Sequence, residues 1–134
     1  MYLLDIVVPS ELRKRDGNPA VARWLRDKPA DSLYLSVVTI GEIERGIVRL
    51  RGRDPAFAEA LESWLGGMLL DYGDRILPIN TRIARRWGGL SGRIGNDGAD
   101  LLIAATALEH GLAVVTRNVR RFEATGVVVI DPFA

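Results

Sequence analysis

Short apolar segments alternate with longer amphipathic segments along the whole chain. The short segments are rich in β-branched residues and end at turn residues, which is typical of buried strands. They predict strands at residues 2–8, 33–36, 75–79, 112–116 and 127–130. Between them, apolar residues recur every three or four positions, which indicates amphipathic helices. We expect these helices at residues 19–28, 39–50, 55–70, 81–93, 99–110 and 118–123.

Residues that favour helix ends support several of these boundaries. Asn18 and Asp54 each precede a proline, so each is expected to cap the helix that follows it. Asn80 is expected to cap the helix that begins at Thr81, and Gly111 is expected to end its helix in the left-handed conformation. A further helix start is predicted near Pro9, with Ser10 as the N-cap, and Asn118 is expected to cap the last short helix.

The alternation of strands and helices predicts βαβ units, and hence a parallel sheet covered by helices on both faces. We expect an α/β fold with four or five strands, formed by residues 1–134 as a single domain. In such sheets, ligands bind at the carboxyl ends of the strands near a topological switch point. Candidate functional residues are therefore sought where predicted strands end.

Composition excludes several classes of protein. Of the 134 residues, 48% are hydrophobic, which is enough for a core and argues against disorder. The absence of cysteine excludes a disulfide scaffold, a zinc ribbon and a thiol nucleophile, and it fits a reducing compartment. No segment approaches the roughly 18 uncharged apolar residues of a membrane span. We therefore expect a cytoplasmic protein without a membrane partner.

The net charge of +1 does not suggest binding to nucleic acid by charge alone. However, the basic residues are almost all arginine, with Lys14 and Lys28 as the two lysines. The planar arginine side chain is suited to bidentate contacts with phosphate. Codon usage in a GC-rich genome would also explain the arginines. Their position in the fold has to decide between this explanation and a role in phosphate binding.

Three acidic residues lie in apolar surroundings: Asp5 in the first predicted strand, Glu42 beside an apolar helix face, and Asp100 at the start of an apolar helix. Each has an ordinary explanation as well, namely backbone N–H donors for Asp5, solvent for Glu42 and the helix dipole for Asp100. Carboxylates that cluster repel one another unless a divalent cation neutralises them. Mg²⁺ and Mn²⁺ prefer such oxygen ligands, whereas zinc would require cysteine or more histidine than the chain contains. The pattern therefore indicates metal-assisted hydrolysis of a phosphodiester.

Four blocks of the sequence resemble the PIN-domain ribonucleases, in the branch of the VapC and FitB toxins. The blocks are Leu3-Leu4-Asp5 with Ser10-Glu11-Leu12, Gly41-Glu42-Ile43 with Arg45-Gly46-Ile47, Asp100 with residues 102–107, and Val115–Asn118 with Phe122 and residues 126–127. They follow the family's order from residue 3 to residue 133, so the resemblance covers essentially the whole chain.

The resemblance implies a three-layer α/β/α sandwich and a Mg²⁺- or Mn²⁺-dependent endoribonuclease site. Asp5 and Asp100 would be the main metal ligands, and Glu42 would bind the metal directly or through water. Asn118 would complete the catalytic pocket. Supporting roles would fall to the hydroxyl groups of Ser10 and Thr116.

The resemblance also implies partners. Arg117, Arg120 and Arg121 lie beside the expected metal pocket and would hold the RNA backbone. Relatives are toxins that a small antitoxin holds inactive, and operator DNA is bound only through that antitoxin. They commonly form homodimers and larger complexes with the antitoxin.

The sequence departs from the family pattern at three positions. Ile6 and Val7 replace the usual hydroxyl and amide residues after the first aspartate, and Arg121 stands where relatives often carry an acid. Losing groups that support a metal site typically costs about 10–100-fold in affinity or activity. The alternative is therefore a weakened or inactive PIN-like module that acts through antitoxin binding and autoregulation. A phosphatase on a similar sheet is a third interpretation. Such an enzyme would normally have polar residues after the nucleophilic aspartate, whereas Ile6 and Val7 follow Asp5 here.

Overall fold

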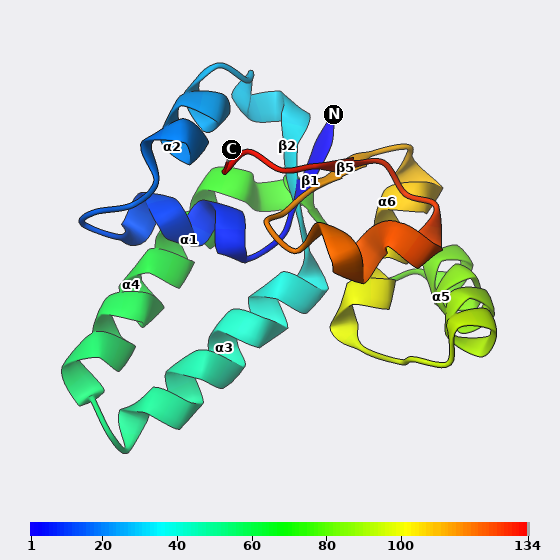
Figure 1. Cartoon of the computed structure of the whole chain (residues 1–134). Coiled ribbons are helices and arrows are strands. Elements are labelled where there is room, and N and C mark those ends of the chain that lie inside the picture. Colours follow the sequence, from blue (N-terminus) through cyan, green and yellow to red (C-terminus); the bar gives the residue numbers. More distant parts are fainter. Residues whose placement is uncertain (134) are drawn as a thin grey trace.

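The computed structural model describes residues 1–133 and contains a five-stranded sheet with the order β3-β2-β1-β4-β5 (Figure 1). Every neighbouring pair of strands is parallel. The strands are β1 (Tyr2–Leu4), β2 (Leu33–Ser36), β3 (Ile76–Leu77), β4 (Ala113–Val115) and β5 (Val129–Ile130).

Helices connect all of these strands. The α-helices are α1 (Val7–Arg13), α2 (Pro19–Arg26), α3 (Val37–Arg51), α4 (Pro55–Tyr72), α5 (Thr81–Ile94) and α6 (Ala99–His110). Short 3₁₀ helices are η1 (Ala30–Ser32), η2 (Gly73–Arg75) and η3 (Val119–Thr125). Among residues 1–133, no helix is both long and apolar enough to cross a membrane.

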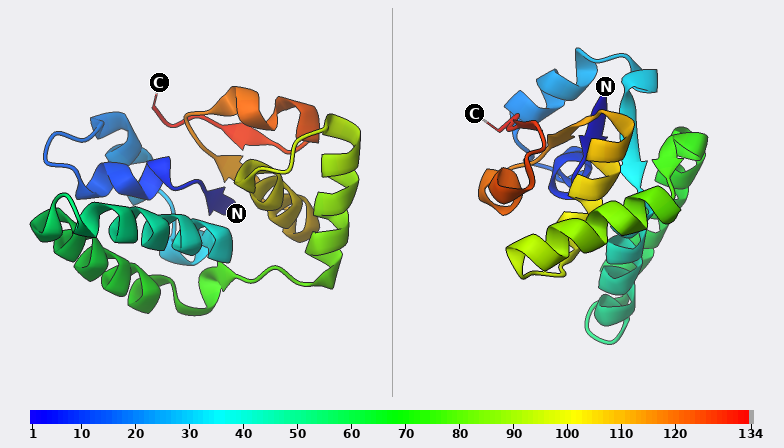
Figure 2. Two further views of the ribbon diagram at one scale, coloured as in Figure 1. Left: turned by 90° about the horizontal axis from the view of Figure 1, so that it is seen from below. Right: turned by 90° about the vertical axis from the view of Figure 1, so that its right-hand side faces the viewer.

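Two apolar clusters, one on each face of the sheet, form the core. Successive side chains of a strand point to opposite faces, so the buried residues Leu3 and Leu4 of β1 belong to different clusters. Leu4 packs with residues of α1–α4, and Leu3 packs with residues of α5, α6 and η3. Figure 2 shows these two helical layers on either side of the sheet. The predicted three-layer α/β/α sandwich with a parallel sheet is confirmed.

Local capping agrees with the sequence for most helices. The side chains of Asn18, Asp54 and Asn80 accept hydrogen bonds from the first turns of α2, α4 and α5. Gly111 follows α6 with φ +67°, in the left-handed region that glycine tolerates best. Ser36 caps α3 by accepting from the N–H of Val38, so this helix begins two residues earlier than predicted.

The predicted strand at residues 2–8 is wrong after Leu4. The Val8 N–H donates to the Asp5 carbonyl, and the chain turns directly into α1. Pro9 lies in the first turn of this helix, where proline is tolerated because no N–H is needed there. The prediction of Ser10 as an N-cap is wrong for the same reason, since Ser10 lies inside α1 and its N–H donates to the Ile6 carbonyl.

Two predictions near the carboxyl terminus also change. The segment after Asn118 is the 3₁₀ helix η3, and the Asn118 side chain makes no capping hydrogen bond there. Strands β3 and β5 comprise two residues each, which is shorter than predicted. Both are the edge strands of the sheet, where only one neighbour is available to extend the pairing.

Removing either central leucine should destabilise the fold. We expect Leu3→Ala and Leu4→Ala each to lower the free energy of unfolding by about 2–5 kcal/mol, because each leaves a cavity in one cluster. Leu70→Ala is the control, because Leu70 is 86% exposed and the change should cost less than about 0.5 kcal/mol. Urea denaturation measures the three values, and a loss for Leu3→Ala or Leu4→Ala no larger than that for Leu70→Ala would contradict the assignment of that leucine to the core.

Candidate functional site

The strand order places a topological switch point at the carboxyl end of β1. The chain continues from β1 to β2 on one side, while β4 lies on the other side of β1. Asp5 follows β1, Thr116 follows β4, and α3 with Glu42 follows β2. Helix α6 runs back to β4, so its first turn with Asp100 starts at the same edge. The topology therefore brings together residues that are up to 111 positions apart.

Asp5 is a buried carboxylate with fixed orientation. It is 4% exposed, and its Oδ1 accepts a hydrogen bond of 2.9 Å from the backbone N–H of Ile6. Its Oδ2 accepts a hydrogen bond of 2.7 Å from the Thr116 hydroxyl. The Asp5 N–H donates to the carbonyl of Val115, which continues the pairing of β1 with β4. The Ile6 N–H is the kind of backbone donor that would satisfy a buried acid in any protein. The Thr116 hydroxyl is a second donor, and it comes from the residue that follows β4.

Thr116 connects this carboxylate to the loop that follows β4. Its buried hydroxyl donates to Asp5 and also accepts a hydrogen bond of 3.0 Å from the Asn118 N–H. Asn118 is half-buried at the start of η3. Thr116 therefore lies where the sequence placed a supporting residue, and Asn118 lies one hydrogen bond further from Asp5.

Glu42 lies on α3 and is half-buried. Burial is the main cause of the raised pKa of its carboxyl group, and the neighbouring negative charges of Asp5 and Asp100 raise this pKa further. Arg45 and Arg121 act in the opposite direction. Within residues 1–133, the buried Oε1 atom of Glu42 has no hydrogen-bond partner. An oxygen in this state is available to a cation or to a bound water.

Asp100 lies in the first turn of α6. Burial raises the pKa of its carboxyl group, and Asp5 raises it as well. Arg121 lowers this pKa, and the Arg121 Nε lies 3.8 Å from Asp100 Oδ2. The charge of Asp5 thus acts on both Glu42 and Asp100, as expected for three acids that share a site.

The donor set suits a hard divalent cation, although the acids do not converge on one point. No three acidic or histidine side chains in the described part of the chain lie close enough together to hold a metal ion. Mg²⁺ commonly keeps several of its waters and binds through one or two carboxylates, so three converging ligands are not required. The unpaired Glu42 Oε1 and the mutual repulsion of the acids both favour a cation. The residues are therefore compatible with Mg²⁺ or Mn²⁺, which one or two carboxylates would hold.

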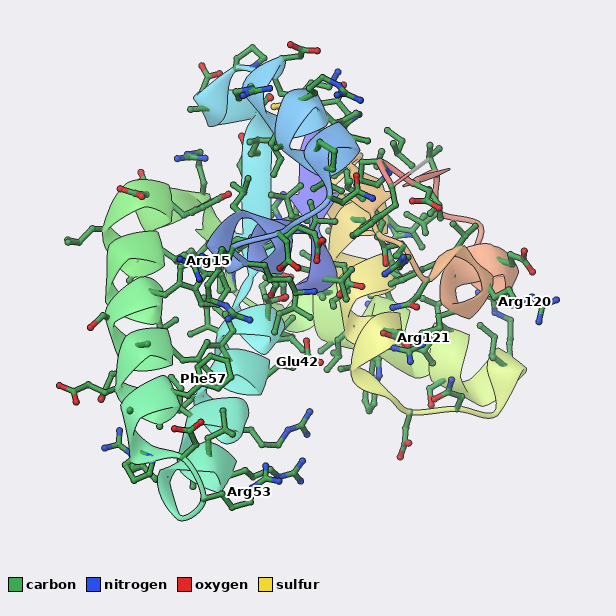
Figure 3. The ribbon with its side chains drawn as sticks, turned by 60° about the vertical axis from the view of Figure 1, so that its left-hand side comes forward. Arg15, Glu42, Arg53, Phe57, Arg120 and Arg121 are labelled. Carbon is green, nitrogen blue, oxygen red and sulfur yellow. The ribbon has the colours of Figure 1, made fainter. Side chains whose placement is uncertain are left out.

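A basic surface adjoins these acids. The exposed residues Arg117, Arg120 and Arg121 line a hollow of about 430 Å³ together with Asn118 and Asp131. Figure 3 shows Arg120 and Arg121 projecting from η3, and Glu42 projecting from α3. The three arginines predicted to bind RNA therefore lie on one surface, next to the acidic centre.

Arg13 is a residue near the site that no local pattern in the sequence reveals. Its guanidinium lies over the rings of both Phe57 and Trp64, 5.4 Å from each centroid. Arg13 lines a pocket of about 130 Å³ with residues that include Ser10 and Glu42. The charged segment around Arg13 resembles an exposed surface, and no local signal shows that α4 folds over it. Ser10 and Glu42 thus line the same pocket, which is compatible with a supporting role for Ser10.

The sequence matches the PIN domain family over residues 2–128. It is 34% identical over 140 aligned residues to VapC ribonuclease Y4jK of Sinorhizobium fredii, covering 99% of this chain and 98% of the relative. It is 32% identical to Toxin FitB of Neisseria gonorrhoeae, covering 99% of both chains. The crystal structure of FitAcB from Neisseria gonorrhoeae superimposes with a TM-score of 0.87 and 32% identity, again covering 99% of each chain. The chain therefore belongs to the PIN-domain family, in the group of the VapC and FitB toxins.

Proposed function

We propose that this protein is a metal-dependent endoribonuclease toxin. The observation that carries the proposal is the buried Asp5, which Ile6 and Thr116 hold in place beside two acids with raised pKa values, Glu42 and Asp100. Grouping carboxylates in this way costs free energy, and a divalent cation would offset that cost. The ribonuclease name of the relative from Sinorhizobium fredii supports RNA as the substrate.

The residues would share the chemistry as follows. Asp5 and Asp100 would hold Mg²⁺ or Mn²⁺, with Glu42 binding it directly or through a water. The cation held there would supply Lewis-acid activation for hydrolysis of an RNA phosphodiester by water. Thr116 keeps Asp5 oriented through its hydroxyl, and Asn118, held by the same hydroxyl, would complete the pocket. Ser10 would support Glu42 from α1.

The basic surface of Arg117, Arg120 and Arg121 would hold the RNA backbone. Contacts to phosphate fix the position of a nucleic acid without reading its sequence. The hollow between these arginines lies next to Asp100, since Arg121 pairs with that acid. RNA bound there would have a phosphate close to the acidic centre.

We further propose a cognate antitoxin protein as partner, as the toxin name of the relative from Neisseria gonorrhoeae suggests. The protein would act in the cytoplasm as a homodimer, form a larger complex with the antitoxin, and reach operator DNA only through it. Co-expression with the product of a short adjacent reading frame, followed by light scattering, tests the complex and its stoichiometry.

A second candidate function rests on Ile6 and Val7. Neither side chain offers a polar atom to the metal site, and Ile6 packs against the apolar cluster of α1–α4 instead. A protein with a failed site would act only by binding the antitoxin. Calorimetric titration with Mn²⁺ separates the two, because a failed site would show no Mn²⁺ binding that depends on Asp5 or Asp100.

Neutralising the site acids should abolish cleavage. We expect Asp5→Asn, Asp100→Asn and Glu42→Gln each to lower RNA cleavage with Mg²⁺ or Mn²⁺ by at least about a hundredfold, because each removes charge from the cation site. Glu44→Gln is the matched control for Glu42, because Glu44 lies on the same helix and is exposed. Initial rates on a labelled RNA measure the effect, and an unchanged rate for Asp5→Asn would refute the assigned site.

The raised pKa of Glu42 makes a prediction for stability without metal. Its folded-state pKa lies above the unfolded value of about 4.5, so ionised Glu42 destabilises the fold at neutral pH. Glu42→Gln should therefore raise the free energy of unfolding in EDTA at pH 7. The gain should shrink as pH falls through the raised pKa and vanish below about 4.5. Thermal denaturation across this pH range measures the effect, with Glu44→Gln in parallel. A loss of stability for Glu42→Gln at pH 7 would contradict the prediction.

The basic surface predicts a salt-dependent contribution to RNA affinity. We expect Arg117→Gln and Arg120→Gln each to weaken RNA binding in EDTA. Each should reduce the slope of log affinity against log salt by about 0.7, as for the loss of one phosphate contact on a single strand. Arg26→Gln on α2 serves as a control with the same change of charge. Fluorescence anisotropy at several salt concentrations gives the slopes, and three equal slopes would argue against this surface.

A further inference from the structure

Arg121 differs from the other arginines of the basic surface because it is engaged with the acidic centre. Its Nε lies 3.8 Å from Asp100 Oδ2, while its side chain stays 61% exposed. Its charge also acts on Glu42, across the site on α3. Arg121 therefore places a positive charge where the proposed function requires a divalent cation.

The neighbouring arginines do not share this position. Within residues 1–133, Arg120 forms no ion pair with an acidic side chain. Arg117 lies over the ring of Phe133, with the guanidinium 4.7 Å from its centroid. Arg45 acts on Glu42 electrostatically, but it lies on α3 and does not pair with Asp100. Among these residues, Arg121 is the one that both contacts an acid of the site and lines the hollow for RNA.

An exposed ion pair of this length is weak, so it is easily exchanged. A divalent cation at Asp100 would remove the attraction that holds Arg121 and would repel its guanidinium. The same side chain is long and exposed, so it can turn toward the hollow without any change in the backbone. The Arg121 guanidinium can therefore pair either with Asp100 or with a phosphate in the hollow.

On the basis of the proposed function, we propose that Arg121 is a built-in counter-ion that competes with the divalent cation for Asp100 and, once displaced, binds an RNA phosphate. Without the cation, Arg121 partly neutralises Asp100 and Glu42. With the cation bound, its charge is released to the basic surface. Metal binding and RNA binding are then coupled, and by linkage each strengthens the other by the same factor.

The first test is the affinity for Mn²⁺ in the absence of RNA. Arg121→Gln should bind Mn²⁺ about three- to tenfold more tightly than the unmodified protein, because both the competition and the repulsion are removed. Arg120→Gln is the matched control, since it removes the same charge one residue away and should change the affinity by less than about twofold. Isothermal titration calorimetry gives both values. Equal or weaker binding by Arg121→Gln would overturn the proposal.

The second test measures the coupling itself. The probe is a phosphorothioate 2′-O-methyl oligonucleotide that a gel shows to be uncut, and its affinity is measured by anisotropy in EDTA and in saturating Mn²⁺. The enhancement by Mn²⁺ should be about threefold smaller for Arg121→Gln than for the unmodified protein. Arg120→Gln should lower the affinity in both conditions and leave the enhancement unchanged. The same enhancement in all three proteins would also overturn the proposal.

These outcomes are distinct from a failure of the proposed function. If the unmodified protein shows no Mn²⁺ binding that is lost in Asp100→Asn, the metal site itself is wrong. If that binding is present but Arg121→Gln behaves like Arg120→Gln, the metal site stands and only the role of Arg121 is refuted. Arg121 is exposed, so its substitution should leave the fold intact, and circular dichroism before titration checks the fold of each variant.

Discussion

The hydrogen bond from the Thr116 hydroxyl to Asp5 joins the ends of the two strands on which the site depends. It lies directly beyond the pairing of β1 with β4, so the register of the sheet decides whether the two side chains meet. A shift of one residue would turn Thr116 to the other face of the sheet, because side chains alternate along a strand. The leucines on the two faces of β1 fix that register through two separate apolar clusters. The packing of the core therefore also determines the geometry of the site.

Grouping Asp5, Glu42 and Asp100 costs electrostatic free energy, which the rest of the fold must offset. The negative charge of Asp5 raises the pKa of both Glu42 and Asp100, and one buried oxygen of Glu42 lacks a partner within the described chain. Such groups are placed against the preference of an apolar interior for neutral or paired atoms. Arg121 relieves part of this repulsion from the solvent side. The centre therefore favours an additional positive charge.

The turn after β1 shows why local pattern was insufficient there. The segment Leu3–Val8 is apolar and β-branched, which favours a strand, yet the chain leaves the sheet at Asp5 and enters α1. The Asp5 N–H still pairs with the Val115 carbonyl, but the next N–H, that of Ile6, donates to the Asp5 side chain instead of to a neighbouring strand. Val8 then packs in the apolar core as part of helix α1 rather than as part of a strand. Burial was predicted correctly for this residue, whereas the element that achieves the burial was not.

The sequence by itself determined the alternation of elements, most helix caps, the two-sided burial of the sheet and the three acids in apolar surroundings. These features are encoded within a few residues, through periodicity, capping side chains and local polarity. Only the tertiary structure decided which groups meet: Thr116 with Asp5, Arg121 with Asp100, and Arg13 between Phe57 and Trp64. Such contacts depend on strand order and helix packing, which join residues far apart in the chain. A local pattern shows that a charge needs a partner, but the choice of that partner is made by the fold.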